Sequence, residues 1–141
     1  MTFYLDANVL VSLFIADAHS SAVADWLGEL KAELTVSDFG RLEFAAVVSR
    51  QTREGLLNED TAREIFADCD LWCSETVRLE RIRPHDFDAA NSIVRDFATK
   101  LAAPDAIHLA FAANREMTLV TFDRRLAQAA QGRGTAVVMP G

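Results

Sequence analysis

Short apolar runs alternate with longer segments of helical periodicity along this chain, and that alternation limits the fold more than any other feature. Regular alternation of this kind favours a parallel sheet with helices on both faces. We therefore predict an α/β protein of three layers, α/β/α, around a central parallel sheet of about five strands. The predicted strands are Thr2–Leu5, Glu33–Val36, Thr76–Leu79, Met117–Thr121 and Thr135–Val138.

The segments between these runs carry helix start signals. Ser37 or Asp38, Asn58 and Asp123 are N-cap candidates, and Pro104 is predicted at the first position of its helix. No repeat, linker or change in composition divides the chain, so residues 1–141 are predicted to form a single domain. The predicted helical segments are 9–15, 20–30, 38–48, 58–73, 84–97, 104–111 and 124–130.

The charge balance limits the class of partner. With a net charge of −7 and a pI near 4.9, the chain lacks the basic character of a surface built for broad nucleic-acid binding. An enzyme that reaches phosphate through metal ions and a few local arginines is the exception. The candidates for such a patch are Arg41, Arg50, Arg53, Arg124 and Arg125.

The two cysteines and the N-terminal region give no sign of a special compartment. Cys69 and Cys73 are four residues apart on one predicted helix, which is poor geometry for a disulfide, and no second pair completes a zinc site. No signal peptide or membrane span is predicted, because Asp6 and Asn8 interrupt the first apolar run. The expected compartment is the cytoplasm, without a membrane.

Four acidic residues, far apart in the chain, are placed to meet at one site. Asp6 and Asp123 each follow a predicted strand, Asp105 opens a helix, and Glu43 lies two turns into another. Functional groups of α/β folds gather at the carboxyl ends of parallel strands. Four carboxylates at that edge would repel one another unless a cation neutralised them. The pattern predicts a divalent metal site.

Each of these residues also has a plain structural interpretation. Asp6, Asp105 and Asp123 could simply cap or precede helices, and Glu43 could be an exposed helical residue, although its neighbours are mostly apolar. His108 follows Asp105 by three residues, so it either packs in the core or bonds an acid. Two further polar side chains could orient the acids by hydrogen bonding, namely Asn8 and Thr121.

Together these motifs resemble the PIN-domain ribonucleases, specifically the VapC toxins of type II toxin–antitoxin pairs. The resemblance extends over essentially the whole chain and rests on Tyr4–Val9, Ser37 with Glu43, Ala103–Ala110 and Val120–Arg124. Any one of these motifs is weak, but four in this order are specific. The resemblance implies a metal-dependent endoribonuclease with Mg²⁺ or Mn²⁺ as cofactor and RNA as substrate.

The resemblance also implies roles for individual residues. Asp6 and Asp105 would bind the metal directly, Glu43 and Asp123 would complete the catalytic acids, and Asn8 and Thr121 would support them. Ala7 stands where such toxins often carry Thr or Ser, and Arg124 and Arg125 follow Asp123 where many carry another acid. These departures bear most on a second metal ion.

The implied partners are a cognate VapB-type antitoxin and a second copy of the chain. Apolar positions that could serve such contacts rather than the core are Val11, Leu13, Phe14, Trp26 and the segment Ile65–Trp72.

Three other functions share features with this chain. A signalling receiver domain needs paired acids after the first strand and an Asp after the third, but Arg81–Pro84 follows the third strand here. A haloacid-dehalogenase-type phosphatase needs an Asp where this chain has Asn8. A non-catalytic binding domain with an acidic metal pocket stays open as the alternative, although the full set of acids disfavours it.

Overall fold

The first strand of the chain lies at the centre of the sheet. In the computed structural model, which describes all of residues 1–141, β1 (Thr2–Leu5) pairs with β2 (Glu33–Ser37) and with β4 (Thr118–Val120). The edges are β3 (Arg78–Glu80) and β5 (Val137–Val138). The strand order is β3-β2-β1-β4-β5, and every pairing is parallel. The predicted five-stranded parallel sheet is confirmed.

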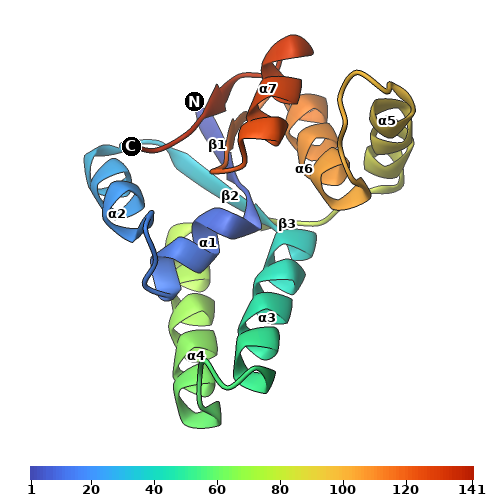
Figure 1. The fold of residues 1–141 in the computed structure, drawn as a ribbon. Helices are drawn as coiled ribbons and strands as arrows, with labels where there is room; N and C mark the ends of the chain where they lie inside the picture. The colour runs from blue at the N-terminus through green and yellow to red at the C-terminus, as the bar shows by residue number, and fades with distance from the viewer.

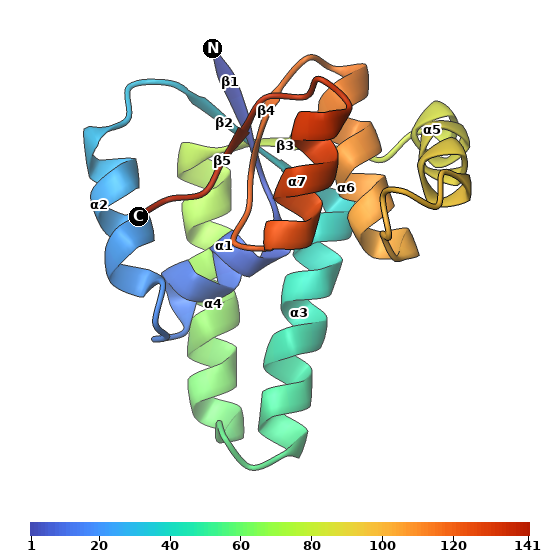
Figure 2. The ribbon, with the colours of Figure 1, turned by 45° about the horizontal axis from the view of Figure 1, so that its top comes forward.

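Seven helices cover the two faces of this sheet and complete the three predicted layers. Figures 1 and 2 show α1 to α4 on one side of the sheet and α5 to α7 on the other, with α3 and α4 extending beyond it as a long hairpin. The helices are α1 (Ala7–Phe14), α2 (Ser20–Glu29), α3 (Asp38–Arg53), α4 (Glu59–Thr76), α5 (Pro84–Arg95), α6 (Ala103–Asn114) and α7 (Arg124–Gly132).

Alternate residues of β1 face the two layers, because successive side chains of a strand point to opposite faces. Tyr4 joins the core formed with α5, α6 and α7. Phe3 and Leu5 join the other core, formed with α1 to α4. Each of these three side chains is almost completely buried, and burial of one such side chain is worth roughly 1.5–3 kcal/mol. The three consecutive apolar residues that predicted the strand thus serve both cores.

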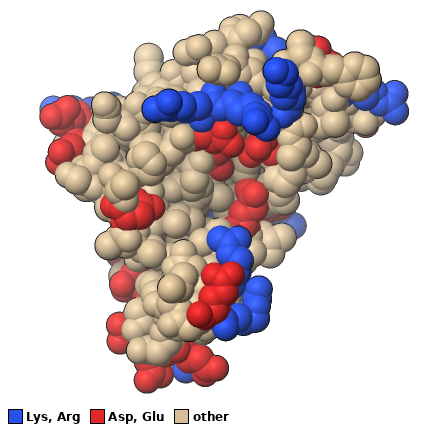
Figure 3. All heavy atoms as spheres, in the orientation of Figure 1, with Lys and Arg blue, Asp and Glu red and all other residues tan.

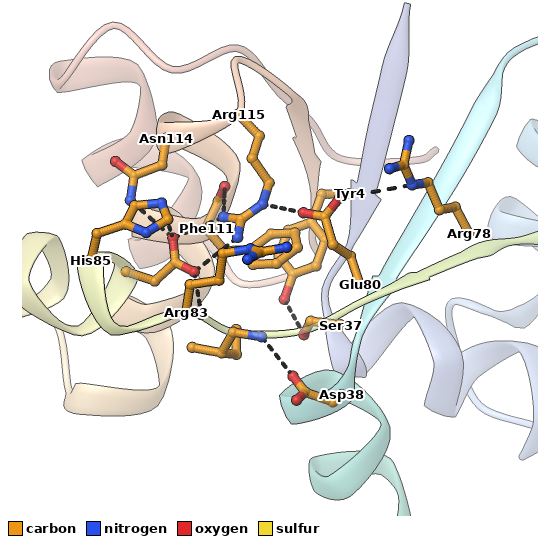
Figure 4. A network of polar contacts seen from close by, with 12 residues as sticks. Tyr4, Ser37, Asp38, Arg78, Glu80, Arg83, His85, Phe111, Asn114 and Arg115 are labelled. Atoms are coloured by element: carbon orange, nitrogen blue, oxygen red, sulfur yellow. Dashed lines mark hydrogen bonds and ion pairs between the residues drawn. The ribbon is translucent and has the colours of Figure 1, made fainter.

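A half-buried arginine, Arg115, joins α6 to α5 and β3 (Figure 4). The two terminal nitrogens of Arg115 donate to the two carboxylate oxygens of Asp86 at 2.8 and 2.9 Å, and its Nε donates to Glu80. Asp86 is fully buried and also accepts from the Arg83 backbone N–H and from Asn114. Burial opposes its ionisation, but these donors prevail and lower the pKa of Asp86 to about 2.

Three of the predicted N-caps are made by the expected side chains, including that of Asp123 at α7. Ser37 Oγ accepts from the Gly40 N–H at the start of α3, and Asn58 Oδ1 accepts from the Thr61 N–H at the start of α4. Cys69 and Cys73 are free thiols on the side of α4 that faces the core, and both are buried there. Their interpretation as small apolar residues is confirmed.

Several predicted boundaries were wrong. The helix expected over residues 84–97 ends at Arg95. Side chains take over its last hydrogen bonds, because the Thr99 hydroxyl donates to the Ile93 carbonyl oxygen and Asp96 Oδ1 accepts from the Ala98 N–H. As a result Phe97 is 90% exposed. The third strand begins at Arg78 rather than 76, since α4 continues to Thr76.

Smaller shifts occur elsewhere. The sixth helix starts at Ala103, which puts Pro104 at its second position rather than its first. The fourth and fifth strands are shorter than predicted, at Thr118–Val120 and Val137–Val138. None of the helices is both long enough and apolar enough to cross a membrane.

Candidate active site

The four predicted acids line one hollow at the carboxyl edge of the sheet. Asp6 follows β1, Asp123 follows β4, Asp105 lies in the first turn of α6, and Glu43 reaches in from α3. The hollow has a volume of about 480 Å³. Convergence at this edge follows from the parallel sheet, because strands of one direction end together.

Asp6 does not cap its helix, contrary to the structural alternative considered from the sequence. It occupies the N-cap position of α1, but its carboxylate makes no capping hydrogen bond. Instead Oδ2 accepts from the Thr121 hydroxyl at 2.8 Å, and Asn8 Nδ2 donates to the same hydroxyl at 3.2 Å. Asn8 Oδ1 in turn accepts from the Phe122 N–H. Asn8 and Thr121 therefore fix the orientation of this buried carboxylate.

Asp123 combines the two roles that the sequence left open. Its Oδ1 accepts from the N–H groups of Arg125 and Leu126, which caps α7. Its own N–H donates to the Thr121 hydroxyl at 3.0 Å. Capping therefore occupies one carboxylate oxygen, and the side chain still lines the hollow.

Glu43 is held by a histidine. His108 is 1% exposed, and its Nε2 contacts Glu43 Oε1 and lies 3.5 Å from Asp6 Oδ1. Both alternatives left open for His108 hold, because it is buried and also bonds an acid, which is Glu43 on α3. Asp6, Glu43 and His108 each offer a ligand atom within 4.8 Å of the other two. Asp105 lines the same hollow outside this close group.

A chain of buried hydroxyls sets the tautomer of His108. The Gly40 N–H donates to Ser37 Oγ, the Tyr4 hydroxyl lies 2.7 Å from that oxygen, and it also lies 2.6 Å from His108 Nδ1. Burial raises the pKa of Tyr4 well above its ordinary value, so Tyr4 keeps its proton. A bare Nε2 facing two carboxylates would be repelled. We therefore assign a proton to Nε2, which makes His108 a donor to the acids rather than a metal ligand.

The electrostatics of the hollow reflect crowded negative charge. Burial, followed by the charges of Asp123 and Asp6, raises the pKa of Asp105 from 3.8 to about 6. Burial also raises the pKa of Asp6, although His108 and Thr121 oppose this. For His108 burial favours the neutral ring, but the bond to Glu43 and the charge of Asp6 prevail and raise its pKa. A bound cation would relieve this repulsion.

The donor set suits a hard divalent ion. Carboxylate oxygens are the ligands that Mg²⁺ prefers, and Mg²⁺ takes only one or two of them while it keeps several waters. The half-buried Asp105 and the buried Asp6 both line the hollow, and Asp6 lies close to Glu43. The carboxylates therefore fit a divalent cation, as the pattern of acids predicted.

The five arginines predicted as a possible phosphate-binding patch do not lie together. Arg50 lines the acidic hollow, whereas Arg41 pairs with Asp70 of α4 at 2.7 Å and Arg53 donates to Ser49. Arg125 lines a separate hollow beside the acidic one. Arg124 is exposed at the start of α7.

Sequence reasoning missed His19. Its ring stacks on Phe122 with 4.1 Å between ring centroids and 13° between planes, and both residues line the acidic hollow. No local pattern marks His19, because the contact joins the segment after α1 to the segment after β4.

Comparison with known proteins agrees with this geometry. A profile of the PIN domain matches residues 3–132. The chain is 31% identical over 150 residues to Ribonuclease VapC35 of Mycobacterium tuberculosis, covering 98% of this chain and 96% of the relative.

Solved structures share the fold at low sequence identity. VapBC2 from Rickettsia felis, solved bound to a DNA fragment from its promoter, has a TM-score of 0.75 at 13% identity and covers 98% of both chains. VapC20 of Mycobacterium tuberculosis, described as a sarcin-ricin loop cleaving toxin, has a TM-score of 0.72 at 16% identity and covers 90% of this chain and 94% of the other.

Proposed function

This chain belongs to the PIN domain family, and on that premise we propose that it is a metal-dependent endoribonuclease, the toxin of a type II toxin–antitoxin pair. The observation that carries the proposal is the meeting of four carboxylates, from four separate segments, in one hollow. The relative VapC35 bears the name of a ribonuclease, and it matches nearly the whole chain.

We assign Asp6 and Asp105 as the direct ligands of a Mg²⁺ or Mn²⁺ ion. The raised pKa of Asp105, caused first by burial and then by the neighbouring acids, supports a cation at this place. A hard cation bound there supplies an acidified water and neutralises negative charge that develops on the phosphate. Glu43 and Asp123 complete the acidic set through water or a second ion.

The chain's own residues hold this set in position for hydrolysis. Thr121 and Asn8 fix the Asp6 carboxylate, and the Nε2–H of His108 holds Glu43 beside it. Water attacks phosphorus and gives a proton to a carboxylate of the set, the bond from phosphorus to the leaving ribose oxygen breaks, and solvent protonates that oxygen. Because the side chains are already hydrogen-bonded in place, little reorganisation accompanies the reaction.

RNA is the proposed substrate. Single-stranded or looped RNA can bend its backbone into a recessed acidic site, whereas a regular duplex cannot. Arg50 is the cation that lines the hollow itself, so it is placed to contact a phosphate next to the one cleaved. The stacked pair of His19 and Phe122 offers a ring face at the same hollow for an unpaired base.

The proposed partners are a VapB-type antitoxin and a second copy of the chain, acting in the cytoplasm. The solved relatives include toxin–antitoxin complexes, which supports the first of these. Four of the apolar residues named from the sequence lie half-buried in α1 and α2 against the core, so their outer faces are available, whereas Ile65 and Cys69 of the segment on α4 are buried. Those half-buried residues are Val11, Leu13, Phe14 and Trp26.

The test compares RNA 5′ ends after expression of the parent chain and of Asp6→Asn. Asn keeps the shape of the side chain and removes only its charge, so the variant is expected to fold and to lose cleavage. Asp68→Asn, a change of an exposed acid on α4, is the matched control and is expected to cleave as the parent does. Identical 5′-end profiles for the parent and Asp6→Asn, with both proteins folded by circular dichroism, would remove the nuclease assignment. Calorimetry of the purified parent with Mg²⁺ and Mn²⁺ tests the metal independently.

A further inference from the structure

A basic hollow lies beside the acidic one. It has a volume of about 450 Å³, and three of its lining residues are cationic, namely Lys100, Arg125 and Arg133. Asp96 is its one acid and pairs with Arg133 at 3.2 Å. Lys100 and Arg125 form no ion pair. The hollow thus carries surplus positive charge in a protein whose net charge is −7.

The two hollows are joined through short pieces of chain. Arg125 lines the basic hollow and its backbone N–H donates to Asp123, which lines the acidic one. Lys100 lies five positions before Asp105, and five residues span at most roughly 17 Å. Figure 3 shows a band of Lys and Arg directly above the acidic patch, over the region that Figure 1 labels α7.

The walls of the basic hollow are ordered by internal hydrogen bonds. Thr99 is buried, and its hydroxyl contacts the carbonyl oxygens of Ile93 and Asp96. Asp96 Oδ1 accepts from the Ala98 N–H. On the other wall, Arg125, Gln128 and Arg133 project from α7 or its end. The cations are therefore presented from fixed backbone rather than from a free tail.

The lining chemistry favours a polyanion over a protein segment. The only apolar residues of the hollow are Ala98 and Ala129, so it offers no pocket for the aromatic or large apolar anchors that dominate protein interfaces. Lys, Arg and Gln are the side chains that contact phosphate and sugar oxygens along a nucleic-acid backbone.

We propose that the hollow formed by Lys100, Arg125, Gln128 and Arg133 is a backbone-phosphate subsite for the RNA strand that enters the acidic hollow. This inference rests on the proposed nuclease function and names how that site holds its substrate. An RNA strand bound there crosses the start of α7, so that the phosphodiester next to the bound phosphate reaches the carboxylates. The cations offset the repulsion between the RNA phosphates and these carboxylates. An acidic protein can bind RNA in this way without a basic surface overall.

The test measures binding of a single-stranded RNA to Asp6→Asn protein, which removes cleavage, with and without the added pair Lys100→Gln and Arg125→Gln. Each phosphate contact contributes about 0.7 to the slope of log affinity against log salt for single strands, so losing two cations is expected to flatten that slope by about 1.4. Affinity at low salt is expected to fall at least tenfold, by a similar factor for RNAs of different sequence. Arg63→Gln, an exposed residue near the start of α4 that lines neither hollow, is the control and is expected to leave both quantities unchanged.

A second measurement separates this subsite from the nuclease function. In the cleavage-competent parent, the Lys100→Gln and Arg125→Gln pair is expected to raise KM about tenfold with a much smaller change in kcat. Normal cleavage with an unchanged KM and salt slope would overturn the subsite and leave the nuclease function standing. A pair of changes that weakens binding of a cognate antitoxin but not of RNA would also overturn it. Absence of cleavage in the parent itself would instead remove the proposed function.

Discussion

Replacing Asp105 by Asn is expected to stabilise the metal-free protein while it abolishes cleavage. The folded protein raises the pKa of Asp105 from 3.8 to about 6, first by burial and then by repulsion from Asp123 and Asp6. Between those two pH values the folded state binds more protons at this site than the unfolded state does. Stability therefore falls as pH rises through that window, and the full penalty is present above pH 6.

The size of this penalty follows from the same two values. One pKa unit corresponds to about 1.4 kcal/mol, so the rise at Asp105 amounts to about 3 kcal/mol before screening. The side chain is only half-buried, so solvent and salt reduce this to about 1–2 kcal/mol. Asn also loses about 0.3–1 kcal/mol of attraction to the start of α6. The expected net gain in the free energy of unfolding is about 1 kcal/mol at neutral pH.

The assay is urea denaturation of the parent and Asp105→Asn in EDTA, at about pH 4 and about pH 7.5. At the higher pH the free energy of unfolding is expected to be larger for the Asn variant than for the parent. At the lower pH this difference is expected to be absent or reversed. Added Mg²⁺ is expected to stabilise the parent but not the variant, because binding to the folded state alone shifts the equilibrium. Asp68→Asn is the control, because Asp68 is an exposed acid that lies outside the acidic hollow. An Asn variant less stable than the parent at neutral pH in EDTA would refute the account of crowded charge.

Two other changes test the scaffold around the site. Asp86→Asn is expected to lower the free energy of unfolding by about 2–3 kcal/mol, because the half-buried Arg115 keeps only Glu80 as counter-charge and because the lowering of the Asp86 pKa from 3.8 to about 2 corresponds to about 2.5 kcal/mol. Denaturation at neutral pH measures this against the exposed Asp88→Asn on the same helix, and a loss below about 1 kcal/mol would contradict it. Tyr4→Phe keeps the ring beside Phe111 but removes the hydroxyl between Ser37 and His108, so a loss of about 1–3 kcal/mol is expected. Nitrogen NMR of His108 is then expected to show a change in how the proton is shared between the ring nitrogens, and an unaltered spectrum would argue against the hydroxyl chain.

The sequence was sufficient for the sheet and for the general position of the acids. Short apolar runs predicted β1 and β4, and the rule that parallel strands end together brought Asp6 and Asp123 to one edge. Glu43 and Asp105 followed from their places on helices that start at the same edge. The catalytic and metal-binding roles of these residues stay predictions.

The sequence was not sufficient for the contacts that hold the site in place. Helical and strand periodicity describe which face a residue occupies, but not which distant side chain meets it. His108 and Glu43 are 65 positions apart, and Thr121 and Asp6 are 115 apart. The same limit explains why capping of α1 stayed open as an interpretation of Asp6. A hydroxyl from the other end of the chain competes for its carboxylate, and only the tertiary structure brings that hydroxyl near.

The central position of β1 has a consequence for synthesis of the protein. The first strand to leave the ribosome stays without one of its two neighbours until Thr118–Val120 has been made, and the Asp6 carboxylate stays without its hydroxyl until Thr121 follows. A nascent or prematurely terminated chain that lacks these residues holds Asp6 without its partners. The acidic centre is therefore completed only after the segment that carries Thr121 and Asp123 has been made and has folded beside β1.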